Sequence, residues 1–131
     1  MESLKISTGQ ISLQILDDNG EPRGVFKFNP QDIESAKQFV RIKNELTDKQ
    51  LEFDARISAC ETEEEKVELL SEIVDYFNDL IDKCFGSGSS EILFGGAKTL
   101  SMFADFFEGI TPYYEKASND RLAKYNKKSK K

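Results

Sequence analysis

The pattern of apolar and polar residues changes its period once along this chain, close to residue 29. Up to residue 28, apolar residues alternate with polar ones, which is typical of strands with one buried face. Residues 17–22 contain Asn-Gly and predict a tight turn, so the segments on either side of it should pair as a hairpin. Phe26 and Phe28 should share the inner face of the returning strand.

The alternation before this turn shifts by one position at Gly9. Leu4 and Ile6 occupy even-numbered positions, whereas the next apolar residues occupy the odd-numbered positions 11, 13 and 15. A β-bulge at Gly9 would bring both sets to one face of a long strand, because a bulge inserts one residue. Two separate strands would explain the same pattern. The N-terminal part is therefore expected to be a β-hairpin or a short meander.

From Asn29 onward, apolar residues recur every three or four positions, which predicts helices. Asn29 and Pro30 should cap and begin a first helix that extends to about residue 57. Residues 47–50 have the spacing of a capping box and could divide this helix, but a single helix is favoured. A second capping box at Thr62 precedes the best-defined apolar stripe, at positions 67, 70, 74, 77, 81 and 84.

Residues 84–96 combine four glycines and three serines with large apolar side chains. Gly86 can end the preceding helix, and Gly95 can end a short helical turn that begins near Ser89, because glycine adopts positive φ without steric cost. The large apolar groups must be buried within this chain or against a partner. The loop therefore points to packing and recognition, and its glycines are expected to let it project Phe94 away from its own helix toward a partner.

Two further helices are expected after this loop. Residues 99–110 form a segment that is apolar nearly all round, so its helix should be central in the domain or face a partner. Thr111 and Pro112 should act as N-cap and first residue of a last helix that ends near Tyr125.

These elements predict an α+β fold in which a hairpin or short meander packs on a bundle of four to five helices. Residues 1–125 should form a single domain, with the β-hairpin region in 1–28 and the helical region in 29–125. Residues 126–131 should be a disordered basic tail.

Charge is divided unevenly along the chain. Residues 116–131 hold seven of the 18 basic residues and one of the 24 acids, a net charge of +6, which leaves 11 bases and 23 acids, a net of −12, in residues 1–115. An acidic body repels the phosphate backbone, so binding to a specific nucleic acid is not expected. The lysine-rich end is interpreted as a solvated terminus.

Composition argues against an enzyme. The chain has no histidine, which removes the commonest general base and a common metal ligand. Cys60 and Cys84 have no metal-site spacing and are expected to be reduced, as in the cytoplasm. No apolar run reaches the length of a membrane span, and the first residues do not have the pattern of a secretory signal.

Two more specific interpretations, a calcium site and a phosphate-binding loop, are also not supported by the sequence. Asp75, Asp79 and Asp82 repeat at helical spacing, which indicates one solvated helix face and not a calcium loop. The glycine loop resembles a phosphate cradle, but it lacks the Gly-Lys-Ser/Thr ending and follows a helix instead of a strand. No metal and no cofactor is therefore expected.

Several motifs together resemble the tail assembly chaperones of long-tailed bacteriophages and prophages of Gram-positive bacteria. They are Leu-Lys-Ile-Ser-Thr-Gly in residues 4–9, Phe-Asn-Pro in residues 28–30, and an acidic helix that ends in Ile-Asp-Lys-Cys-Phe-Gly-Ser-Gly-Ser-Ser-Glu-Ile-Leu-Phe-Gly-Gly in residues 81–96, followed by a Phe-rich helix. The resemblance covers most of the chain and is sharpest in residues 85–96.

The resemblance implies a non-catalytic protein that binds the tape measure protein during tail assembly, self-associates, and acts in the cytoplasm of the bacterial host without entering the mature virion. The major tail protein is a further candidate partner. An acidic body around a Phe-rich patch suits this role, because a chaperone offers apolar surface while it stays soluble. The candidate contact residues are Phe85, Ile92, Phe94, Phe103, Phe106 and Phe107, of which about half are expected to be ordinary core residues.

Two other classes of protein remain as alternatives. A structural virion component, such as a head-tail connector or a tail terminator protein, would share the small size and self-association but would remain in the particle. A metal- or nucleotide-dependent enzyme is least favoured, because the chain lacks histidine and a nucleotide fingerprint.

Overall fold

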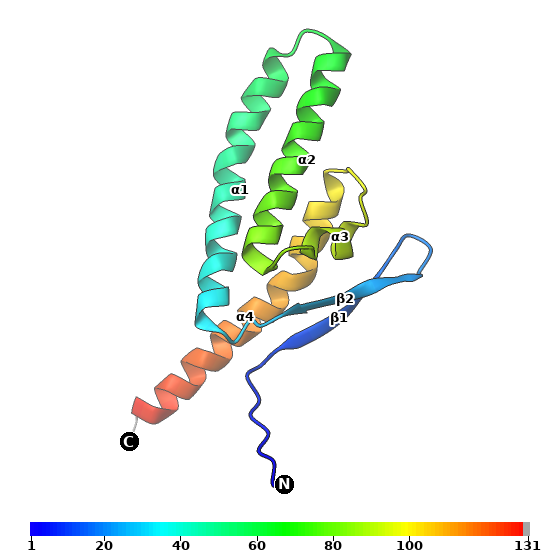
Figure 1. The fold of residues 1–131 in the computed structure, drawn as a ribbon. Helices are drawn as coiled ribbons and strands as arrows, with labels where there is room; N and C mark the ends of the chain where they lie inside the picture. The colour runs from blue at the N-terminus through cyan, green and yellow to red at the C-terminus, as the bar shows by residue number, and fades with distance from the viewer. Residues whose placement is uncertain (130–131) are drawn as a thin grey trace.

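The computed structural model describes residues 1–129, which form a two-stranded antiparallel hairpin followed by four helices. The hairpin packs at one end of an antiparallel helix pair, and a long last helix runs diagonally from behind this pair past the base of the hairpin (Figure 1). The α+β fold expected from the sequence is therefore confirmed. The elements, in chain order, are β1 (Ile11–Leu16), β2 (Pro22–Phe28), α1 (Ile33–Ala59), α2 (Glu63–Phe85), α3 (Ser89–Phe94) and α4 (Ser101–Ser129).

The hairpin forms where Asn-Gly predicts it, and its register pairs Ile11 with Phe28 and Leu13 with Phe26. The Asp17 carboxylate closes the turn by accepting hydrogen bonds from the backbone N–H groups of Asn19 and Glu21, each at 2.9 Å. Phe26 and Phe28 are buried, which confirms the predicted inner face.

The long strand with a bulge at Gly9, and the alternative of two strands before the turn, are both wrong. β1 begins only at Ile11, and its one irregularity lies between Ile15 and Leu16. The reason is that β2 ends opposite Ile11, after which the chain turns toward α1. Residues before Gly9 therefore have no strand of their own chain alongside them.

Helix α1 begins three residues later than expected. Asp32 is its N-cap and accepts a hydrogen bond from the backbone N–H of Ser35 at 2.8 Å. Asn29 instead folds the chain into a turn, because its side-chain oxygen accepts from the N–H groups of Gln31 and Asp32. The helix then continues unbroken to Ala59, so the single helix is confirmed.

The second capping box is confirmed at α2. The Thr62 hydroxyl accepts from the Glu65 N–H at 3.1 Å, and the Glu65 carboxylate accepts from the Glu61 N–H at 3.0 Å. α2 runs antiparallel to α1, and the far end of this pair has its own small core of Phe53, Leu69 and Ile73. An exposed ion pair between Arg56 and Glu72, 3.1 Å apart, joins the two helices there.

The glycine loop also folds as predicted in outline. Gly86 ends α2 with φ of 113°, and α3 occupies the six residues from Ser89 to Phe94. Asp82 supports α3 from the preceding helix, because its carboxylate accepts from both the backbone N–H of Ser90, at 2.8 Å, and the Ser90 hydroxyl, at 3.1 Å. The expectation that Asp82 is only a solvated acid is therefore wrong, whereas Asp75 and Asp79 are exposed.

A break at Thr111 and Pro112 does not occur. α4 is one helix with Pro112 inside it, although proline removes one helical hydrogen bond. Packing outweighs that cost, since Ile110 and Tyr114 on either side of Pro112 are buried in the same core. The helix includes the first part of the predicted 126–131 tail, and residues 130 and 131 lie outside the described part of the chain.

The main core lies where the hairpin, α3, α4 and the near ends of α1 and α2 meet. The Phe39 and Tyr114 rings stack with centroids 4.0 Å apart and join α1 to α4. The Arg121 side chain adds a polar link, because its Nη1 donates to the Pro30 carbonyl at 2.8 Å. The core residues with the largest side chains are Phe26, Phe28, Phe39, Phe94, Phe103, Phe106 and Tyr114.

A candidate protein-binding groove

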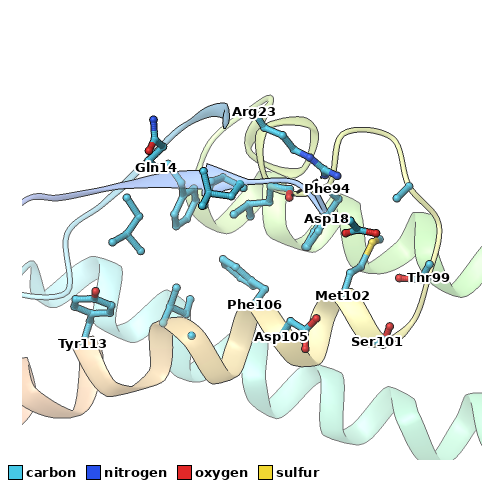
Figure 2. A pocket seen from close by; sticks show the side chains of 18 residues that line it. Gln14, Asp18, Arg23, Phe94, Thr99, Ser101, Met102, Asp105, Phe106 and Tyr113 are labelled. Carbon is cyan, nitrogen blue, oxygen red and sulfur yellow. Dashed lines mark hydrogen bonds between the residues drawn. The ribbon is translucent and has the colours of Figure 1, made fainter. Parts of the chain in front are cut away.

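A groove of about 670 Å³ lies between the hairpin and α4, beside the ring contacts that join the two elements. In Figure 2, the strands form one side of this space, α4 forms the opposite side, and side chains from both point into it. Its wall residues from the hairpin include Leu13, Ile15 and Leu16, and those from α4 include Met102, Ile110 and Tyr113.

The floor of the groove is aromatic and comes from three separate segments. Phe26 of β2, Phe94 of α3 and Phe106 of α4 all line it. The Phe106 ring lies edge-on to both others, with centroid distances of 5.6 Å to Phe26 and 6.1 Å to Phe94. Such edge-to-face packing makes the floor rigid and apolar.

One side of the groove is an open sheet edge. In the described residues, β1 has no neighbouring strand except β2, and no backbone hydrogen bond joins β1 to any other segment. In an antiparallel pair, every second residue of a strand directs its N–H and C=O away from the partner strand. β1 therefore offers unused backbone groups beside an apolar floor, which is the arrangement that accepts an added extended segment.

The charged side chains at the groove are few. Asp18 and Asp105 place exposed carboxylates at its rim. Arg23 also lines the groove, but its guanidinium is turned to α3, where Nη1 donates to the Leu93 carbonyl at 3.4 Å. The rim therefore favours an apolar ligand that carries positive charge beside its apolar part.

The structure changes the interpretation of Phe94. We expected the loop to project this ring away from the body, but Phe94 is 6% exposed and packs edge-on to Phe103 at 5.2 Å. The expected projection is wrong, because the glycines around α3 let that short helix fold back against β2 and α2. Only the groove side of the ring faces open space.

The other candidate contact residues also lie in or against the core. Phe103 and Phe106 are buried, whereas Phe85, Ile92 and Phe107 are half-buried. Of the six candidates, Phe94 and Phe106 line the groove. Sequence reasoning missed the groove residues of β1, together with Tyr113. Their signal was the alternation in residues 11–15 and the aromatic residue directly after Pro112.

The ionisable groups with altered pKa values lie outside the groove lining. Burial raises the pKa of the Cys84 thiol to about 11, so this thiol is neutral at physiological pH. Burial, and then the hydrogen bond that its hydroxyl donates to Glu45, raise the pKa of Tyr76 to about 12. The Cys84 shift reflects packing against the core, whereas the Tyr76 shift also reflects its carboxylate neighbour Glu45.

The described residues contain neither a cluster of metal ligands nor a membrane-spanning helix. No group of three or more Cys, Asp or Glu side chains there is arranged to hold a metal ion. None of the helices in residues 1–129 is both long and apolar enough to cross a membrane.

The fold is that of a small α+β protein with a groove between its β-hairpin and its last helix. The chain belongs to DUF6673, a family of unknown function, whose profile matches residues 24–131. The matched region begins in β2 and includes all four helices, so β1 and the residues before it lie outside it. Comparison with curated proteins and with solved structures finds no match.

Proposed function

We propose that this protein is a tail assembly chaperone that binds the tape measure protein without catalysis, and that the groove between the hairpin and α4 is the binding site. The tape measure protein is proposed as the partner because of the motif resemblance described above. The observation that supports this location of the binding site is the open apolar groove beside an unpaired strand edge. Action in the bacterial cytoplasm and absence from the finished particle belong to the same proposal.

The groove suits an apolar segment that would otherwise aggregate. Its aromatic floor buries apolar side chains, and the open edge of β1 can satisfy backbone groups of a bound chain. Asp18 and Asp105 would attract lysine or arginine beside that segment. The occupant we propose is therefore an apolar segment of the tape measure protein with basic residues next to it.

The test is co-expression with the tape measure protein, measuring how much of that protein stays soluble and co-purifies. Tyr113→Asp places a charge at the groove, whereas Leu122→Asp places the same charge on an exposed position of the same helix. We expect Tyr113→Asp to weaken binding at least about tenfold, equivalent to about 1.4 kcal/mol, and Leu122→Asp to bind like the wild type. Circular dichroism of both variants checks that they are folded.

Charge reversal gives a second matched pair. Asp105→Lys changes the groove rim, and Glu108→Lys makes the same change on the same helix at an exposed residue outside the lining. Only Asp105→Lys should lower the affinity. Equal binding by all four variants would exclude the groove as the site. If purified virions contain the chain in stoichiometric amounts, a structural virion component is the better description.

A further inference from the structure

The residues before β1 form an exposed apolar arm. Residues 2–8 have no regular secondary structure and lead away from the hairpin and helices (Figure 1). Leu4 is 85% exposed and Ile6 is 74% exposed. These two side chains alternate with polar residues, as in a strand with one buried face, yet neither is covered in this chain. The apolar face of this segment is therefore available to a partner that would bury it.

A clamp at the base of the arm sets its direction. The Asn29 side-chain amide donates to the Thr8 carbonyl at 2.9 Å, which ties the arm to the start of the helical region. Gly9 follows with φ of 94°, and a Cβ at this position would lie 2.4 Å from Cγ of Gln31. Only glycine fits there, because of both the positive φ and the close approach. The clamp holds the arm away from the groove of its own chain.

The open edge of β1 matches the arm in length and pattern. An arm of seven residues extends about 23 Å at 3.3 Å per residue, and the six residues of β1 extend about 20 Å. A strand added at this edge would direct alternate side chains toward α4. Leu4 and Ile6 would then enter the groove, and Ser3, Lys5 and Ser7 would face solvent.

We propose that residues 2–8 of one copy pair with the open edge of β1 in a second copy and place Leu4 and Ile6 in its groove. This inference deepens the proposed function and rests on it in one respect, namely that the tape measure protein displaces the arm. Self-association then covers the groove until that protein is present. Every copy has both the arm and the open edge of β1. Two copies that each place their arm on the other's edge would therefore form a symmetric dimer with no arm left unpaired.

The first experiment measures mass by light scattering after size-exclusion chromatography, over a hundredfold range of concentration. The variant Leu4→Asp/Ile6→Asp charges the apolar face of the arm. The control Ser3→Asp/Ser7→Asp adds the same charge to its other face. We expect the wild type and the control to self-associate, and the Leu4→Asp/Ile6→Asp variant to dissociate at least tenfold more readily. Because Leu4 and Ile6 are exposed, the variant should keep its circular dichroism spectrum.

The second experiment maps the contact. In a background with Cys60→Ser and Cys84→Ser, Lys5→Cys and Gln14→Cys are combined, since Gln14 is exposed on the solvent face of β1, which is the face that Lys5 of the added strand would share. Oxidation should form a disulfide between chains and not within one. A monomeric wild type, equal masses for both arm variants, or a disulfide within one chain would each overturn the proposal.

The two proposals fail in different ways. If the Leu4→Asp/Ile6→Asp variant is monomeric but the wild type does not keep the tape measure protein soluble, the arm contact stands and the proposed function fails. If the tape measure protein is kept soluble and self-association is unaffected by the arm variant, the function stands and the arm contact fails.

Discussion

Replacing Phe26 by alanine tests how the hairpin is held on the helices. Phe26 is 2% exposed, and its ring packs against Phe28 in β2, Phe85 at the end of α2 and Phe106 in α4, with centroids 5.3–5.6 Å apart. It is therefore the side chain that joins three elements at the floor of the groove. Removing it loses burial and leaves a cavity that the two helices and the strand cannot readily close.

The expected loss is about 4 kcal/mol, within the range of about 3 to 5 kcal/mol for buried Phe→Ala changes. Aromatic neighbours contribute about 0.5 to 1.5 kcal/mol per pair, which places this site in the upper half of that range. A domain is stable by about 5 to 15 kcal/mol, so the variant should lose a large part of its stability.

Urea unfolding followed by far-ultraviolet circular dichroism measures this loss, because helices dominate the signal. With a slope of about 2 kcal/mol per molar urea, the midpoint should fall by about 2 M. Val25→Ala is the matched control, since Val25 lies next to Phe26 on the other face of β2 and is 48% exposed. That change should cost less than about 1 kcal/mol. Equal midpoints for the two variants would refute the anchoring role of Phe26.

Two further predictions concern α2. In the same urea assay, Phe77→Ala should lower the free energy of unfolding by about 2 to 5 kcal/mol, because the Phe77 ring packs on Phe103 with centroids 5.2 Å apart. Asp75→Ala removes an exposed ion pair with Lys98 and should lower it by less than about 1 kcal/mol. The pKa of Cys84 rises from its ordinary value of 9.0 to about 11 because the folded state favours the neutral thiol. The stability that this thiol contributes should therefore be complete below pH 9 and should decline as the pH rises to 11, and melting temperatures of Cys84→Ala should decline less steeply over that interval.

Local rules accounted for most of the elements. The turn at Asn-Gly, the capping box at Thr62 and the helix stop at Gly86 each depend on a few adjacent residues, and all three form as expected. These signals are reliable because a cap or a turn is satisfied by hydrogen bonds within four residues. The strong apolar stripe of α2 is equally local, and it gave the best-defined helix.

The errors arose where distant segments compete. Leu4 and Ile6 have a strand pattern, but a strand needs a neighbour, and β2 is too short to provide one. Pro112 has the sequence of a helix start, but the core on both sides of it favours one continuous helix. Phe94 has the sequence of a projecting loop residue, but its own chain provides Phe103 and Phe106 as partners.

Periodicity and capping residues were enough to predict the α+β class, the position of the hairpin and the limits of α2, because both act within single elements. Which aromatic residues are core and which line the groove could not be predicted in this way, since burial depends on the other elements that pack against each residue. The groove itself exists only where β1, α3 and α4 meet. Its open strand edge and the arm clamped away from it by Asn29 and Gly9 are relations between segments, and no pattern within one segment encodes them.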